Sequence, residues 1–369
     1  MLTLTIKKIL RPVVSVATPG IVLAFALVTA GAIAQVLPPE AQALIAFRLD
    51  AASLVAVLKV IDEPPSTSGQ GPEPLARFGF KPVVPPSSWL ERNPVDSRPG
   101  DRWVIHAAAG QDFPATAERV VSGTLGCEST LGVLLRVSPE RAQAFAALSA
   151  KYVLAERAVT GAALLQSDQP ALPGNANAIG AIATPSTPAF RRALETTLTG
   201  ILTRELPNVR AEGAGEIARF AASSVDDHRS WARNRQIVDA GLDAGKGRLM
   251  YDTQSFHLSP DGVPVHFVRA RWLVGQEQGF AVSVWVRGDA TLEVIQTNLR
   301  PASWLRMFEF EGVVSTENLG LILNVIDRNR DGWGEVIVFD GGYEGFALST
   351  LEYSSTGFQP VGTGYAGGC

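Results

Sequence analysis

Apolar residues in the first half of the chain come in runs of the length of β-strands, separated by turns and by one helix start. We predict a strand at Trp103–Ile105 and another at Leu131–Val137. The Ser138-Pro139 pair predicts the start of a helix, with the serine as N-cap and the proline in the first turn, and this helix runs to about Ala150. These elements predict a small α/β unit over residues 101–160.

A longer helical pattern follows a loose stretch at 161–188, which is rich in Pro, Gly, Asn and Ala and which we predict to be a linker. The Thr187-Pro188 pair predicts the cap and first residue of the helix, and Pro207 predicts its end. Apolar residues recur between them every three or four positions, at Phe190, Leu194, Leu198, Ile201, Leu202 and Leu206. Such spacing places side chains on one buried face. With residues 213–228, it predicts a helical connector over residues 189–247.

The C-terminal third, residues 248–369, changes to short runs with β character. The predicted strands include His266–Leu273, Phe280–Val286, Val336–Phe339 and Gly345–Tyr353. A weak internal repeat runs through them: Asp261-Gly262 and Asp331-Gly332 are each followed by an apolar strand and then by a Gly-Phe-Ala sequence. Two strand, loop and strand units of this kind would resemble parts of propeller blades, and chance similarity between β-hairpins is the alternative.

The N-terminus has the pattern of a secretory signal peptide over residues 1–34. Lys7, Lys8 and Arg11 form a positive region, residues 21–30 are apolar, and the small residues before position 35 fit a cleavage site after Ala34. The apolar run after Pro19-Gly20 is shorter than the roughly 20 residues of a membrane-spanning helix. We therefore predict an exported, periplasmic or extracellular, bacterial-type protein without a membrane span after cleavage, and an uncleaved anchor is the alternative.

Residues 35–100 are predicted to hold an apolar segment and a connector. Leu44–Ile61 is apolar, but Arg48, Asp50 and Lys59 interrupt it, and each charge at a bilayer centre costs about 3 kcal/mol. Burial in the core of the protein is therefore the preferred interpretation. The stretch 64–99 carries nine prolines and predicts an extended connection, so the first compact unit is expected to begin near Asp101. The predicted class is α+β, with a small α/β N-terminal region, a helical connector and a β-rich C-terminal module.

Net charge and cysteine content limit the classes of partner that this chain is expected to bind. The net charge is −4 and becomes −7 when the three basic residues of the predicted leader are removed, which disfavours a nucleic-acid binder. Cys127 and Cys369 are the only cysteines, and an oxidising compartment would allow a disulfide between them or two free thiols. An unknown protein or a carbohydrate remains as the expected partner class.

The segment 327–335 carries the most specific chemistry in the chain. Oxygen-bearing side chains stand at positions one, three, five and nine, with glycine at six: Asp327, Asn329, Asp331 and Glu335, with Gly332 between. Calcium prefers six to eight oxygen ligands, and the glycine permits the sharp turn that gathers them. The carbonyl of Trp333 would add a main-chain oxygen. An EF-hand is excluded because position twelve is Val338 and the flanks have strand patterns.

This loop resembles the calcium loops of the FG-GAP and VCBS repeat families, in which Asp-x-Asp/Asn-x-Asp-Gly-x-x-Asp precedes an apolar strand. The resemblance covers residues 320–351, with Glu335 in place of the usual aspartate and with one intact copy only. It implies that Asp327, Asn329, Asp331 and Glu335 bind a structural Ca²⁺ through their side chains and Trp333 through its carbonyl. Arg328 and Arg330 lower the local negative charge, so we expect weak binding, about 10⁻⁴ to 10⁻³ M. A polar turn without an ion is the alternative.

No common signature of acyl transfer or zinc hydrolysis is present, so a binding or structural module is preferred over an enzyme. The alternative function is an exported hydrolase that uses His106, Asp112 and Glu118 of the 101–160 unit as acid and base groups. A transition-metal pair of His257 and His266 beside Asp261 is a weaker hypothesis. The tryptophans of the C-terminal third could bind carbohydrate or protein, or fill the core: Trp272, Trp285, Trp304 and Trp333.

Overall fold

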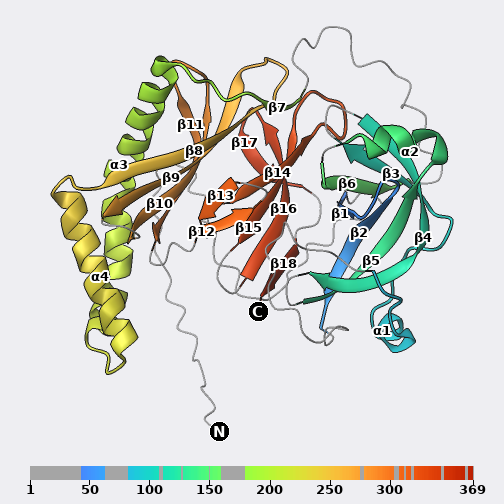
Figure 1. Cartoon of the computed structure of the whole chain (residues 1–369), viewed down its shortest axis with the longest axis horizontal. Helices are drawn as coiled ribbons and strands as arrows, with labels where there is room; N and C mark the ends of the chain where they lie inside the picture. Colours follow the sequence, from blue (N-terminus) through green and yellow to red (C-terminus); the bar gives the residue numbers. More distant parts are fainter. Residues whose placement is uncertain are drawn as a thin grey trace, which may run out of the picture. The chain divides into compact units, whose positions relative to one another are not determined.

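Antiparallel strands dominate the computed structural model of this chain (Figure 1). It describes residues 43–62, 82–107, 111–125, 128–148, 150–158, 179–274, 278–302, 307–310, 313–316, 320–341, 345–361 and 365–368. All of these ranges belong to one compact unit, residues 38–369. The predicted leader, both cysteines and Trp304 lie outside the described residues. Among the helices that are described, none combines the length and the apolar character that crossing a membrane requires.

The first part of the described chain is a closed barrel of six strands in the order β1-β2-β5-β4-β3-β6. Every neighbouring pair is antiparallel, and β1 closes the barrel on β6. The strands are β1 (Leu44–Arg48), β2 (Ser53–Ile61), β3 (Arg102–Ala107), β4 (Gln111–Leu125), β5 (Glu128–Val137) and β6 (Tyr152–Arg157). Two short helices, α1 (Ser87–Arg92) and α2 (Pro139–Ala146), accompany them.

One apolar cluster receives residues from all six strands and from α2, and it fills the barrel. Many of its members are alanines, which suits the narrow interior of a barrel with so few strands. Phe113 and Phe145 are its largest fully buried side chains, and their rings meet edge to face with centroids 5.3 Å apart.

Two predictions for this region are wrong. The unit does not begin near Asp101, because residues 44–61 supply β1 and β2 of the barrel. The predicted α/β unit over residues 101–160 is part of an antiparallel barrel, to which it contributes β3 to β6 and the short helix α2. The apolar segment 44–61 is buried, as the preferred interpretation has it, and forms a pair of strands. Side chains of β1 alternate between the barrel interior, as at Ala46, and a second core outside it, as at Ile45 and Phe47. Burial on both faces explains the continuous apolar run.

The second part is a five-stranded sheet with two helices on one face. Its order is β11-β10-β9-β8-β7, and its strands are β7 (Gly180–Ile182), β8 (Arg248–His257), β9 (Pro264–Val274), β10 (Gln278–Arg287) and β11 (Glu293–Ala302). The helices α3 (Pro188–Ala221) and α4 (Asp226–Asp243) share one apolar cluster with β9 and β10 (Figure 1). The predicted helical connector is therefore the cover of this sheet, and β7 lies within the predicted linker.

Helix α3 begins as predicted but does not end at Pro207. Thr187 caps it by accepting the N–H of Phe190 at 3.2 Å. The helix continues to Ala221 although an interior proline costs about 3 kcal/mol. Two contacts oppose that cost: Val209 packs against the sheet cluster, and Arg210 binds Asp239 and Asp243 of α4 at 3.0 and 2.7 Å. Tertiary packing thus overrides the local stop signal.

The third part is a sheet that is buried on both faces. Its order is β14-β15-β16-β17, with β18 also paired to β16, and its strands are β14 (Leu321–Ile326), β15 (Glu335–Gly341), β16 (Gly345–Ser354), β17 (Gly357–Pro360) and β18 (Tyr365–Gly368). Ile337 of β15 packs in one core with barrel residues, whereas Val336 packs in another with residues of β8 to β10. A separate hairpin joins β12 (Met307–Phe310) and β13 (Val313–Thr316).

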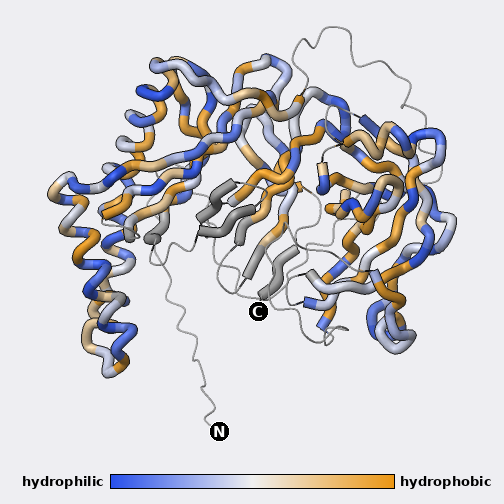
Figure 2. Tube along the Cα trace, viewed as in Figure 1, coloured by the Kyte–Doolittle hydropathy of each residue, from blue (hydrophilic) through white to orange (hydrophobic). Residues whose placement is uncertain are grey.

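The strands predicted in the C-terminal third are confirmed, and apolar residues recur along them (Figure 2). Strands β8 to β11 form a four-stranded antiparallel meander, which we call the first meander, and β14 to β17 form a second one. The two segments with similar sequences therefore share a strand order. Gly279 begins the first of the two Gly-Phe-Ala sequences, and the close approach of the neighbouring strand explains why this position is a glycine. A Cβ atom on Gly279 would overlap the carbonyl oxygen of Trp272 on the neighbouring strand.

Gly279→Ala should therefore lower the free energy of unfolding by about 1–3 kcal/mol, because β9 and β10 must separate to admit the methyl group. The matched control is Gly200→Ala on the exposed side of α3, where a Cβ meets nothing within 4 Å. That change should raise stability by about 0.5–1 kcal/mol. Urea denaturation of both variants tests this, and equal effects would show that the close approach is not a constraint.

Candidate functional site

The loop 327–335 joins β14 to β15 and folds back on its own polar side chains. Asp327 Oδ2 accepts the N–H of Gly332 at 3.2 Å, and Asp331 Oδ1 accepts the N–H of Trp333 at 2.8 Å. Arg330 and Gly332 have φ values of 59° and 86°, in the left-handed region, which gives the turn its tightness. The predicted flanking strands are confirmed. Gly332 occupies a position with positive φ, which favours glycine, as predicted.

Of the predicted ligands, the structure brings Asn329 and Asp331 into direct contact. Asn329 Nδ2 donates to Asp331 Oδ2 at 2.9 Å, and Asn329 Oδ1 accepts the N–H of Asp331 at 3.2 Å. Asp327 is close enough for the charge of Asp331 to act on it. Within the described ranges, no three His, Cys, Asp or Glu side chains form a cluster that could hold a metal ion.

Two carboxylates of the loop are withdrawn from water. Glu335 is 0% exposed, and burial raises the pKa of its carboxyl group, opposed by hydrogen bonds from Arg328. Burial also raises the pKa of Asp327, opposed by the N–H of Gly332. Asp327 Oδ1 is buried and has no hydrogen-bond partner. A buried carboxylate oxygen without a donor is costly. The N–H groups of Arg330 and Asp331 also lower the pKa of the Asp327 carboxyl group.

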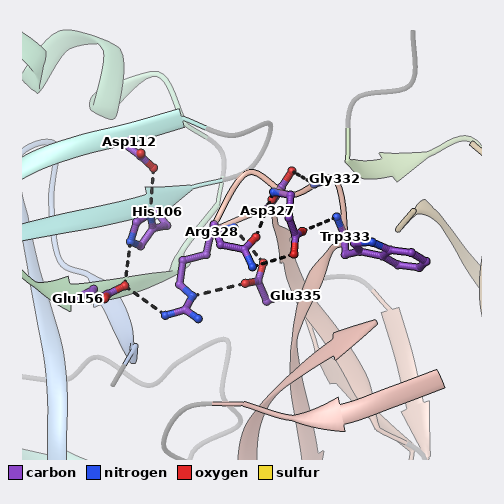
Figure 3. A network of polar contacts seen from close by, with 10 residues as sticks. His106, Asp112, Glu156, Asp327, Arg328, Gly332, Trp333 and Glu335 are labelled. Atoms are coloured by element: carbon purple, nitrogen blue, oxygen red, sulfur yellow. Dashed lines mark hydrogen bonds and ion pairs between the residues drawn. The ribbon is translucent and has the colours of Figure 1, made fainter. Parts of the chain in front are cut away.

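Arg328 is the partner of Glu335. Its backbone N–H donates to Glu335 Oε2 at 2.9 Å, and its Nε donates to Glu335 Oε1 at 3.4 Å. The same guanidinium reaches the barrel, where Nη1 donates to Glu156 Oε2 of β6 at 3.2 Å. Arg328 therefore lies between a carboxylate of the loop and a carboxylate of the barrel (Figure 3).

A second arginine of the loop also binds the barrel. Arg330 Nη2 donates to Asp112 Oδ2 of β4 at 2.9 Å. Between the two barrel carboxylates lies His106 of β3, with Nδ1 2.9 Å from Asp112 and Nε2 3.6 Å from Glu156. Figure 3 shows the resulting chain of contacts from Asp112 through His106, Glu156 and Arg328 to Glu335. We call these five residues together with Arg330 the clasp.

Two hydrogen bonds outside the clasp also hold the loop and the strand before it. Asn324, at an irregularity of the β14–β15 pairing, donates through Nδ2 to the carbonyl of Tyr152 in β6 at 2.7 Å. On the other side, the N–H of Gly334 donates to the carbonyl of Leu258 at 2.9 Å, next to the loop of the first meander. The loop is thus fixed from two directions.

The geometry bears directly on the hydrolase hypothesis. Of the three residues in this hypothesis, His106 and Asp112 are in contact, but Glu118 lies elsewhere and pairs with Arg136 at an exposed position. The third member of the group is Glu156, which the sequence analysis did not single out. His106 is 7% exposed and both of its ring nitrogens face carboxylates. Nδ1 is hydrogen-bonded to Asp112, whereas Nε2 is buried at ion-pair distance from Glu156 and has no hydrogen-bond partner. In this arrangement the ring serves as an ion-pair partner of two carboxylates.

The transition-metal hypothesis fails for His266. This residue is fully buried, with Nδ1 2.7 Å from Ser255 Oγ and Nε2 2.9 Å from the carbonyl of Gly288, so both nitrogens are already bonded. Asp261 is bonded to Ser259 and Arg287 instead. These polar side chains stabilise the first meander.

The tryptophans are mainly structural. Trp272 and Trp285 are 4% and 5% exposed, and each belongs to an apolar core between secondary-structure layers. Trp333 is partly buried and packs against Tyr353, with ring centroids 5.8 Å apart. Of the two alternatives for Trp272 and Trp285, the structure shows core packing.

The chain shows no match to known proteins: no protein-family model, no curated protein and no solved structure matches it.

The stability of the fold should carry a pH-dependent contribution from His106. Burial, the largest single influence, would lower the pKa of His106, but Asp112 and Glu156 together raise it above 6.5. The stabilisation from protonated His106 is therefore complete below about pH 6.5 and is lost as the pH rises through the raised pKa, at about 1.4 kcal/mol per pKa unit. The difference in unfolding free energy between wild type and His106→Gln should shrink across that window.

His266→Gln is the matched comparison, because burial lowers the pKa of His266. The stabilisation from neutral His266 is present above the unfolded pKa of about 6.5 and is lost as the pH falls towards the lowered pKa. The difference between wild type and this variant should therefore grow as the pH rises. Denaturant titrations between pH 5 and about 8 measure both trends, and a flat profile for His106→Gln would refute the role of the two carboxylates.

Proposed function

We propose that this protein is an exported binding or structural module whose 327–335 loop holds a structural Ca²⁺ ion. The observation that carries the proposal is the buried Oδ1 atom of Asp327, which has no hydrogen-bond partner. In the same loop, Asn329 Oδ1 and Asp331 Oδ1 each accept one backbone N–H and keep a second lone pair. A hard cation prefers oxygen ligands of this kind. The resemblance of the sequence to FG-GAP and VCBS loops supports the same assignment.

The residues that would hold the ion are Asp327, Asn329, Asp331 and Glu335 through their side chains and Trp333 through its carbonyl. The ion would supply positive charge to a bend in which two carboxylates are partly or fully buried. Backbone N–H groups of Gly332 and Arg328 already direct positive charge towards these carboxylates. A Kd of about 10⁻⁴ to 10⁻³ M suits a compartment outside the cytosol, where structural calcium sites of this affinity are found.

The structural role follows from the position of the loop. It contacts the barrel through Arg328 and Arg330 and the first meander through Gly334. An ion that stiffens the loop would therefore stabilise the loop, the barrel and the first meander together. Another protein or a carbohydrate remains the proposed partner of such a module.

Adding calcium should raise the thermal stability of the full chain, by about 2.7 kcal/mol when the free ion reaches a hundred times its Kd. Asp331→Asn should remove most of this response, because it takes away one negative charge while an oxygen remains to accept the N–H of Trp333. Differential scanning fluorimetry over a calcium series, with magnesium in parallel, measures the effect.

The first meander supplies a matched control for this experiment. Asp261 Oδ1 accepts the N–H of Val263 at 3.0 Å, as Asp331 Oδ1 accepts that of Trp333, but its neighbours lack the other ligands. Asp261→Asn should therefore leave the calcium response intact. A wild-type protein that shows no calcium response at any concentration would contradict the proposed function.

A further inference from the structure

The two arginines that interleave with the proposed ligands differ in their relation to Glu335. Arg328 and Arg330 both belong to the loop, both carry one positive charge and both bind a carboxylate of the barrel. Arg328 alone also binds Glu335, through its backbone N–H and its Nε. Glu335 is fully buried, so its carboxylate depends on the charge that reaches it inside the protein.

We propose that Arg328 couples the cation site to the barrel: the ion and Arg328 compete for the Glu335 carboxylate, and an ion that takes Glu335 leaves Arg328 to Glu156 alone. This inference rests on the proposed function. It assigns to one side chain the regulation of the affinity of the loop and of its attachment to the barrel.

The competition follows from charge and geometry. A divalent ion on a carboxylate weakens the attraction of that carboxylate for other positive groups, and a guanidinium beside the ion is repelled by it. Arg328 has a second partner already in place, since Nη1 lies 3.2 Å from Glu156 Oε2. The transfer therefore needs little rearrangement of the guanidinium, whereas a side chain without that partner would be left buried and unpaired.

Glu156 sets how readily Arg328 is released. It is shared between Arg328 and His106, and those two groups lower the pKa of Glu156 against the opposing effect of burial. Because coupling between two sites is reciprocal, a cation that strengthens the Arg328–Glu156 pair must itself bind more tightly when that pair is available. Removal of Glu156 should weaken calcium binding although Glu156 is not a ligand.

Calcium titration calorimetry of the full chain, with two pairs of variants, tests the inference. Arg328→Gln removes the competitor and should tighten calcium binding about tenfold, whereas Arg330→Gln removes the same charge without touching Glu335 and should change it less than about threefold. Glu156→Gln should weaken binding about three- to tenfold, and Asp112→Asn, which removes the other carboxylate beside His106, should leave it within about twofold.

The Glu156 and Asp112 pair keeps the test decisive if Arg328→Gln fails to fold, because both of these variants retain the Arg328–Glu335 contact. Equal affinities within each pair, in a protein that binds calcium, would overturn the coupling and leave the calcium site standing. A wild-type chain that takes up no calcium would overturn both proposals, so the two failures are distinguishable.

Discussion

The burial of the Glu335 carboxylate constrains the rest of this structure. Glu335 begins β15 in a sheet that is covered on both faces, so no water reaches its side chain. A buried ionised carboxylate costs several kcal/mol unless a partner of opposite charge is held beside it. Arg328 is that partner, and the loop must bend so that its backbone N–H and its guanidinium both face Glu335. The same bend brings the side chains of Asn329 and Asp331 into contact.

The clasp shows how this local requirement reaches the barrel. When His106 is protonated, the three carboxylates of the clasp are balanced by the positive charges of His106, Arg328 and Arg330. The charges therefore compensate one another within the clasp. Each barrel member stands on one of three neighbouring strands, in the order β4-β3-β6, which places the charges side by side. The pairing of β3 with β4 and with β6 therefore creates the docking surface for the loop, and an apolar core shared by the barrel and the third sheet lies next to it.

The sequence predicts the local features of this protein well and the distant ones poorly. The Thr187 cap, the strands around the 327–335 loop and the glycine of its turn follow from neighbouring residues, and the structure confirms them. The extent of α3 beyond Pro207 and the use of residues 44–61 in the barrel depend on packing against distant segments. Likewise, Arg330 and Asp112 are 218 positions apart, and no local pattern pairs them. The sequence shows that Arg328 and Arg330 alternate with the proposed ligands, but their contacts with the barrel can be recognised only when their partners are known.

The most direct test of this account is an experimental structure of the full chain crystallised with a saturating concentration of calcium. The account predicts an ion bound by Asp327, Asn329, Asp331 and the Trp333 carbonyl at about 2.3–2.6 Å. It also predicts that Glu335 turns to the ion and that Arg328 contacts Glu156 alone. A loop without an ion, in which Arg328 still binds Glu335, would contradict it.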